Sequence, residues 1–123
     1  MNYNELTRRY FESAANVGEL NGPGVFHGAA GNQAQGTWVR FDLQIDAGAV
    51  SAARFLAFGC PHTIAVSAWL AEQAVGHRVK PRLPVAVQEL RDRFAVPVEK
   101  TGRLLIIEDA WLAAAIPALE YRG

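Results

Sequence analysis

The single cysteine of the chain, Cys60, is the residue whose type and position best fit a chemical role. Pro61 follows it, and proline favours the first position of a helix, where its missing N–H is not needed. Cys60 is therefore predicted to be a helix N-cap, where free backbone N–H groups and the helix dipole stabilise a thiolate. A protonated His62 would add positive charge nearby. The alternative is that Cys60 is a small buried apolar residue at a strand-to-helix corner.

The three histidines offer a weaker case for a metal site. His27, His62 and His77 are all possible ligands, but no two of them have the i, i+4 spacing that places ligands on one face of a helix. No second cysteine supports them either. His77 directly follows Gly76, which favours the simpler role of a cation at the end of a helix.

Two further motifs do not support catalysis. The glycine-rich segment HGAAGNQAQG (27–36) is expected to be a loop, but it lacks the Gly-Lys-Ser/Thr of a phosphate-binding loop and precedes a strand. Glu108 and Asp109 are adjacent, and adjacent side chains point about 100° apart on a helix. These two residues are therefore expected to be solvated side chains in the first turn of the last helix and not an acid–base pair. Because no base or orienting group can be assigned to Cys60, the chain is not expected to be an enzyme.

Composition limits the class of protein. The 123 residues fit one domain, 1–123, and half of them are apolar. Basic and acidic residues balance at 12 each, which argues against disorder and against a nucleic-acid-binding surface. One cysteine excludes an internal disulfide framework, and no stretch approaches the roughly 18 apolar residues of a membrane span. No signal peptide is evident at the start. We expect a cytoplasmic domain that binds neither nucleic acid nor membrane.

The elements that would position Cys60 follow from hydrophobic periodicity. A short amphipathic helix is predicted over 4–12 and is followed by turn residues. In WVRFDLQID the apolar residues alternate with polar ones, which predicts a strand with one core face and one solvent face. The apolar residues are Val39, Phe41, Leu43 and Ile45. The turn DAG at 46–48 and a second strand complete a hairpin over 37–58, and another strand is expected near Val25 and Phe26.

After Cys60 the apolar residues recur with the spacing of a helix. A helix is predicted with an apolar stripe on one side and an end at Gly76. A second short helix is expected to begin through Pro84, and a last helix to be disturbed near Pro117. The order of short helix, meander and further helices predicts an α+β fold, with helices packed on one face of a small antiparallel sheet. The three tryptophans are expected in or near the core: Trp38, Trp69 and Trp111.

Four segments in order carry a resemblance to a known family. They are YNELTRRYFESAANVGEL, VRFDLQIDAGAVSAARFLAFGC, IAVSAWLAEQAVG and EDAWLAAAI. Together they resemble the IscU/NifU N-terminal family of iron-sulfur cluster assembly scaffolds over almost the whole chain. The resemblance implies a three-stranded antiparallel sheet flanked by helices. It also implies an exposed site where three cysteines and an aspartate or histidine hold a cluster or metal ion, with sulfur supplied by a cysteine desulfurase.

The ligand positions implied by the resemblance are mostly substituted here. The family carries Cys-Gly-Asp just before the first long strand, where this chain has Gln35, Gly36 and Thr37. A late His-Cys pair of the family falls at Gly102 and Arg103. Only Cys60 remains as a retained ligand position, and it would be at most a weak metal ligand on its own.

This degenerate ligand set has two expected consequences. A [2Fe-2S] cluster normally needs four protein ligands, so a monomer should not hold an iron-sulfur cluster, iron or zinc stably. If Arg103 lies near Cys60, its fixed charge opposes a cation but lowers the pKa of the thiol.

Two functions stay open at this point. In the first, Cys60 accepts sulfur or contacts a cluster during iron-sulfur assembly, and a partner or a second copy in a homodimer completes the site. In the second, the chain is a regulatory or partner-binding module on the scaffold fold that carries no metal. The partners implied by the resemblance are a cysteine desulfurase and other iron-sulfur assembly proteins.

Overall fold

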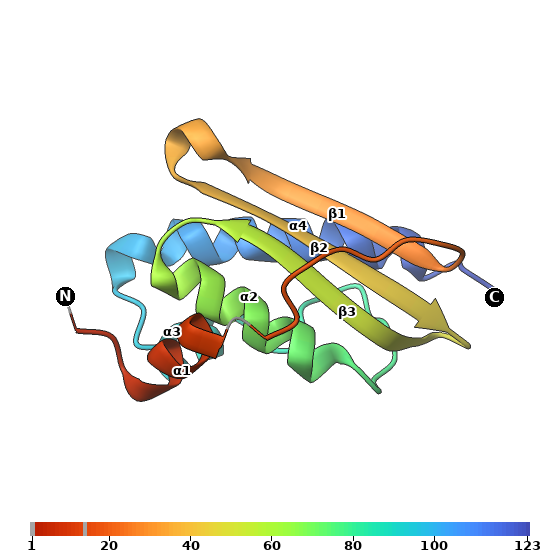
Figure 1. The fold of residues 1–123 in the computed structure, drawn as a ribbon, viewed down its shortest axis with the longest axis horizontal. Coiled ribbons are helices and arrows are strands. Elements are labelled where there is room, and N and C mark those ends of the chain that lie inside the picture. The colour runs from red at the N-terminus through yellow and green to blue at the C-terminus, as the bar shows by residue number, and fades with distance from the viewer. Residues whose placement is uncertain (1, 14) are drawn as a thin grey trace.

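The computed structural model describes residues 2–13 and 15–123 and has an α+β architecture (Figure 1). One antiparallel sheet has the strand order β1-β2-β3, as the sequence predicts. Helices α2 and α4 cover the same face of this sheet, α2 beneath β3 and α4 beneath β1 and β2. The elements are α1 (Glu5–Ser13), β1 (Val25–Asn32), β2 (Thr37–Asp46), β3 (Ala49–Phe58), α2 (Pro61–Ala74), α3 (Val87–Arg93) and α4 (Thr101–Ala118), with 3-10 turns at η1 (Gln33–Gln35) and η2 (Val98–Lys100).

The alternating pattern in β2 is confirmed as the centre of the core. Val39, Phe41 and Leu43 are fully buried, and Ile45 is nearly so. The ring of Phe41 meets that of Trp111 on α4 edge to face, with 4.9 Å between ring centroids. The predicted hairpin also forms, since β2 and β3 pair from Trp38–Phe58 to Asp46–Ala49 around the turn at Ala47 and Gly48.

One polar residue of β2 does not lie on a solvent face as predicted. Asp42 is only 1% exposed, because residues 15–24 cross the outer face of the sheet above it (Figure 1). The Leu20 N–H and the Arg40 Nε–H donate to its carboxylate, each at 2.9 Å, and His27 Nδ1 lies 2.8 Å away. Burial raises the pKa of Asp42, but these hydrogen bonds outweigh it and hold the pKa below its usual value.

Strand β1 is longer than the sequence predicts. The glycine-rich segment was expected to be a loop, but the strand continues through it to Asn32, and only Gln33–Gln35 and Gly36 connect it to β2. The small residues allow close packing of α4. A Cβ placed on Gly28 would lie 2.2 Å from the Ala114 backbone nitrogen. The glycines therefore serve helix packing and do not form an open loop.

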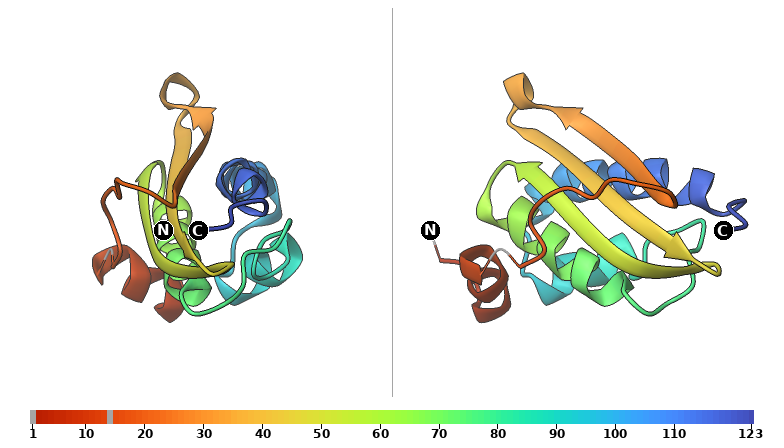
Figure 2. Two further views of the ribbon diagram at one scale, coloured as in Figure 1. Left: turned by 90° about the vertical axis from the view of Figure 1, so that its right-hand side faces the viewer. Right: turned by 45° about the vertical axis from the view of Figure 1, so that its right-hand side comes forward.

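Helix α2 begins and ends as predicted but is buried almost all round. It packs against β3 on one side and against α1 on the side away from the sheet (Figure 2), and Trp69 of the predicted apolar stripe meets Phe94 after α3. His62, Thr63 and Ser67 are consequently buried as well. The helix ends before Gly76, whose φ of 91° marks the left-handed stop.

The last two helices differ from prediction in their starting points. Helix α3 begins at Val87, three residues after Pro84, and α4 begins at Thr101. Glu108 and Asp109 therefore lie in the middle of α4 and not in its first turn. Pro117 sits in the last turn of α4, and the helix continues to Ala118. Of the helices in the described residues, none is long and apolar enough to cross a membrane.

Two of the three tryptophans lie in the core as expected, and Trp38 does not. Trp69 and Trp111 are buried in the core, and Trp38 is half-buried on the outer face of β2.

Candidate functional site around Cys60

Cys60 is the N-cap residue of α2, as Pro61 at the following position predicts. The corner from β3 into the helix is tight, since a Cβ on Gly59 would lie 3.1 Å from the Thr63 side chain. The thiol is half-buried, and its Sγ lies 3.6 Å from the Thr63 hydroxyl. Thr63 was not singled out in the sequence. Its spacing three residues after an N-cap was the available signal, because such residues meet at the start of a helix.

Hydrogen bonds and charge around the thiol favour its ionised form. Burial raises the pKa of Cys60, but donors from the backbone and hydroxyl of Thr63, the backbone of His62 and the charge of Arg103 together lower it below the ordinary value. Arg103 therefore acts on Cys60 as the family geometry implies. Since a depressed pKa and partial exposure are the features of reactive cysteines, the structure does not support an inert buried corner.

His62 does not add the positive charge that its sequence position allows. Burial, followed by the charges of Lys100 and Arg103, lowers the pKa of His62 below its ordinary value, so the ring is neutral near pH 7. Its ring packs edge to face on Tyr3, with 4.7 Å between centroids. The Lys100 ammonium lies 5.9 Å from the centre of the same Tyr3 ring. The charge that acts on the Cys60 thiol therefore comes from Arg103 and not from the His62 ring.

The other predicted site positions are only partly gathered around the thiol. Thr37 is buried at the start of β2, and the pairing of Trp38 with Phe58 puts it at the same end of the sheet as Cys60. Gln35 is exposed in the connection between β1 and β2, which projects beyond the sheet (Figures 1 and 2). In the first turn of α4, Gly102 is exposed and Arg103 is half-buried. The role of these positions as former ligand sites stays a prediction.

The described residues provide no evident metal centre. Within 2–13 and 15–123, no three His, Cys, Asp or Glu side chains lie close enough together to hold a metal ion. His27 is engaged with Asp42, His62 is buried against Tyr3, and His77 lies at the other end of α2.

The fold is shared with solved structures. It is similar to the crystal structure of a putative iron-sulfur cluster assembly scaffold protein for the SUF system from Fervidobacterium islandicum AW-1. The TM-score is 0.67 at 17% identity, covering 96% of each chain. It is equally similar to a NifU-like protein (N-terminal) from Brucella abortus, with a TM-score of 0.68 at 16% identity over 98% of this chain and 95% of that one.

Sequence comparison identifies the family. A model described as the NifU-like N terminal domain matches residues 2–122, so the chain belongs to the NifU N-terminal/IscU family of iron-sulfur cluster assembly scaffolds. The IscU protein of Plasmodium falciparum is 27% identical over 111 residues, which are 89% of this chain and 68% of that protein. Iron-sulfur cluster assembly protein 1 of Arabidopsis thaliana is 29% identical over 116 residues, 91% of this chain and 70% of that protein. Membership places the chain among non-catalytic scaffolds.

The pH dependence of alkylation will test the environment of Cys60. We expect a midpoint below the free-thiol value of about 8.5. Replacing Arg103 with Gln should raise the midpoint, because removing a nearby positive charge disfavours the thiolate. Iodoacetamide labelling followed by mass spectrometry measures both, and Arg8→Gln on exposed α1 is the charge-matched control. A wild-type midpoint at or above the free-thiol value would restore the buried-corner interpretation.

Proposed function

We propose that the chain acts in iron-sulfur cluster assembly as a scaffold-like protein whose Cys60 accepts sulfur from a cysteine desulfurase. The observation that carries this proposal is the lowered pKa of the half-exposed Cys60 thiol at the start of α2, beside Arg103. Family membership supplies the pathway, and the chemistry of the site favours sulfur acceptance over tight metal binding.

The transfer needs a persulfide donor, R–S–SH, on the desulfurase. The Cys60 thiolate attacks the outer sulfur, so a new S–S bond forms as the donor's S–S bond breaks. Cys60 becomes the persulfide, and the donor leaves as a thiolate that takes the electron pair. A thiolate is the required nucleophile, which is why the lowered pKa of Cys60 matters. The charge of Arg103 stabilises the anionic form both before and after transfer.

A stable cluster on the monomer is not part of this proposal. Cys60 is the only thiol, and [2Fe-2S] clusters are usually held by four ligands. Gln35 and Thr37 are neutral, Gly102 has no side chain, and Arg103 carries a positive charge that opposes iron or zinc. A cluster that contacts Cys60 would need ligands from a partner or from a second copy of this chain.

The alternative function is a regulatory or partner-binding module that carries neither sulfur nor metal. The absence of a ligand cluster from the described residues favours this alternative. It predicts a complex with the assembly proteins that does not require the thiol, whereas the proposed function predicts that the thiol is essential.

Anaerobic sulfur transfer distinguishes the two functions. The chain is mixed with a cysteine desulfurase and cysteine, trapped by alkylation and measured by intact-protein mass spectrometry. We expect wild type to gain one sulfur atom on Cys60, Cys60→Ser to gain none, and Arg103→Gln to gain it more slowly. Complex formation is measured in the same samples. Equal binding of wild type and Cys60→Ser, without sulfur on the wild type, would support the alternative module.

A further inference from the structure

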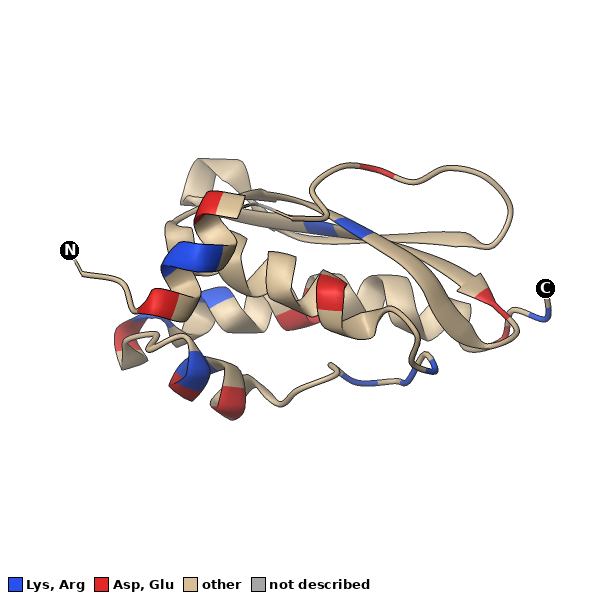
Figure 3. Cartoon of the chain, turned by 60° about the horizontal axis from the view of Figure 1, so that its bottom comes forward, with Lys and Arg blue, Asp and Glu red and all other residues tan. Residues whose placement is uncertain are grey.

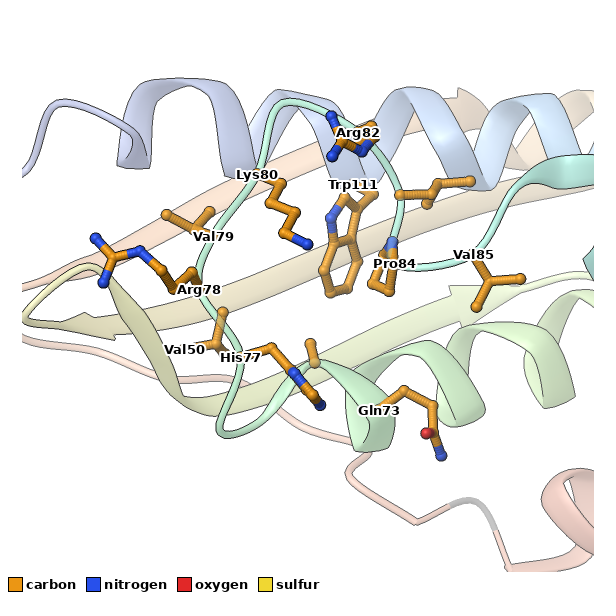
Figure 4. A pocket seen from close by; sticks show the side chains of 12 residues that line it. Val50, Gln73, His77, Arg78, Val79, Lys80, Arg82, Pro84, Val85 and Trp111 are labelled. Atoms are coloured by element: carbon orange, nitrogen blue, oxygen red, sulfur yellow. The ribbon is translucent and has the colours of Figure 1, made fainter.

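The described residues also form a pocket at the opposite end of α2 from Cys60. Its volume is about 210 Å³, and it lies between the end of α2, the connection over residues 75–86 and the middle of α4 (Figure 4). Ligand sites usually measure about 300–1,000 Å³, so this pocket suits a small ligand. None of the residues assigned to the sulfur site lines it, so a ligand held here would be independent of the proposed function.

The floor of the pocket is apolar and contains one unused hydrogen-bond donor. Trp111, Val50 and Leu83 line it and are 3%, 2% and 6% exposed. The indole N–H of Trp111 makes no hydrogen bond to any described residue, yet it is not a fully enclosed atom. Buried tryptophans usually satisfy this donor. A ligand acceptor resting on the floor would supply the missing partner.

The rim of the pocket is positively charged. Lys80 and Arg82 come from the connection after α2, and both side chains lie over the pocket beside Trp111, whereas Arg78 extends away from it (Figure 4). Figure 3 shows the three cations of this connection together, and no Asp or Glu of the described residues lines the pocket. Neither Lys80 nor Arg82 forms an ion pair with a described carboxylate.

We propose that this pocket binds a small organic anion, with its apolar body against Trp111, Val50 and Leu83 and its phosphate or carboxylate group between Lys80 and Arg82. A phosphate or carboxylate can accept charge-assisted hydrogen bonds from both cations. It would also offset the repulsion between the two like charges that line the pocket. The chain has no net charge overall, yet this pocket combines cations at its rim with an apolar floor.

The apolar floor favours a small molecule over an acidic segment of a partner protein. An acidic segment would satisfy the charges at the rim, but the floor of Trp111, Val50 and Leu83 is only 3%, 2% and 6% exposed and is reached only by a group that enters the pocket. The limited volume admits a ring or a short branched chain with its anionic group at the mouth.

NMR of the full chain provides a specific test through the indole N–H signals. The three tryptophans give three such signals, which Trp→Phe variants assign. Phenyl phosphate, the probe, is expected to shift the Trp111 signal saturably and to leave the Trp69 signal in place. Inorganic phosphate lacks the apolar ring, and benzyl alcohol lacks the anionic group. Each should bind at least about tenfold more weakly than phenyl phosphate. Benzoate tells whether carboxylate replaces phosphate, and saturable binding of either anion supports the proposal.

Charge variants complete the test. The double variant Lys80→Gln/Arg82→Gln should lose at least about tenfold in affinity for phenyl phosphate, whereas Arg8→Gln on α1 should lose none. Both changes are at exposed positions, so folding is not at risk. Equal binding of benzyl alcohol and phenyl phosphate, an unshifted Trp111 signal, or binding of only an acidic peptide such as Glu-Glu-Leu-Glu-Glu would each overturn the proposal.

Discussion

A variant with Gln35→Cys, Thr37→Asp and Arg103→Cys is expected to hold an iron-sulfur cluster as a monomer, whereas the natural chain is not. Together with Cys60, these changes supply three thiolates and a carboxylate and remove the positive charge that opposes a cation. Thr37 and Arg103 already lie at the same end of the fold as Cys60. Gln35 is exposed in the connection between β1 and β2, so a cysteine at this position disturbs no core packing.

Anaerobic reconstitution followed by gel filtration measures this gain. Iron, sulfide and visible absorption in the monomer peak should rise from nearly nothing to about one cluster per chain. The matched control is Gln35→Ser, Thr37→Asn and Arg103→Ser, which changes the same positions without adding ligands. A stable cluster on the natural monomer would show that the substituted positions do not matter. An empty but folded triple variant would show that the geometry of the site has been lost.

The sequence predicted the sheet because β2 obeys a simple physical rule. Its alternate residues face α2 and α4, so the period of two is visible without knowledge of the helices. The same rule wrongly places the Asp42 side chain in solvent, because residues 15–24 cover the outer face of the sheet above it. Arg40 is a neighbour on the same strand, but two other partners of Asp42, Leu20 and His27, are distant in sequence and carry no local signal.

Other differences arise from contacts between elements. The glycines of β1 indicated a loop, since glycine weakens a strand in isolation. Here α4 packs so closely that Gly28 has to be small. Similarly, α2 was expected to have one apolar side, but it is buried almost all round, and α1 packs on its side away from the sheet. Neither packing partner can be inferred from the segment itself.

The site was predictable only where its geometry depends on neighbouring residues in the sequence. Pro61 fixed the start of α2 locally and therefore placed Cys60 at the N-cap. The approach of Arg103 came only from the family resemblance, since α4 begins about forty residues later in the chain. The sequence also misassigned His62, because its neutral, buried state depends on Tyr3 and Lys100 from two other parts of the fold.

The close packing of α4 on β1 predicts a large loss of stability in Gly28→Ala. The added Cβ would lie 2.2 Å from the Ala114 nitrogen and 2.5 Å from the Ala110 carbonyl oxygen, and both are helix backbone that cannot move alone. The helix must shift from the sheet, so we expect the free energy of unfolding to fall by about 3 kcal/mol or more. Urea denaturation monitored by tryptophan fluorescence measures this change.

Gly102→Ala is the matched control, because it makes the same chemical change at a different site. Gly102 is exposed in the first turn of α4, and an added Cβ meets nothing within 4 Å. Alanine should therefore leave stability unchanged or raise it by about 0.5 kcal/mol through its better helix propensity. If both variants unfolded at the same urea concentration as wild type, α4 could not lie against Gly28 as the structure places it.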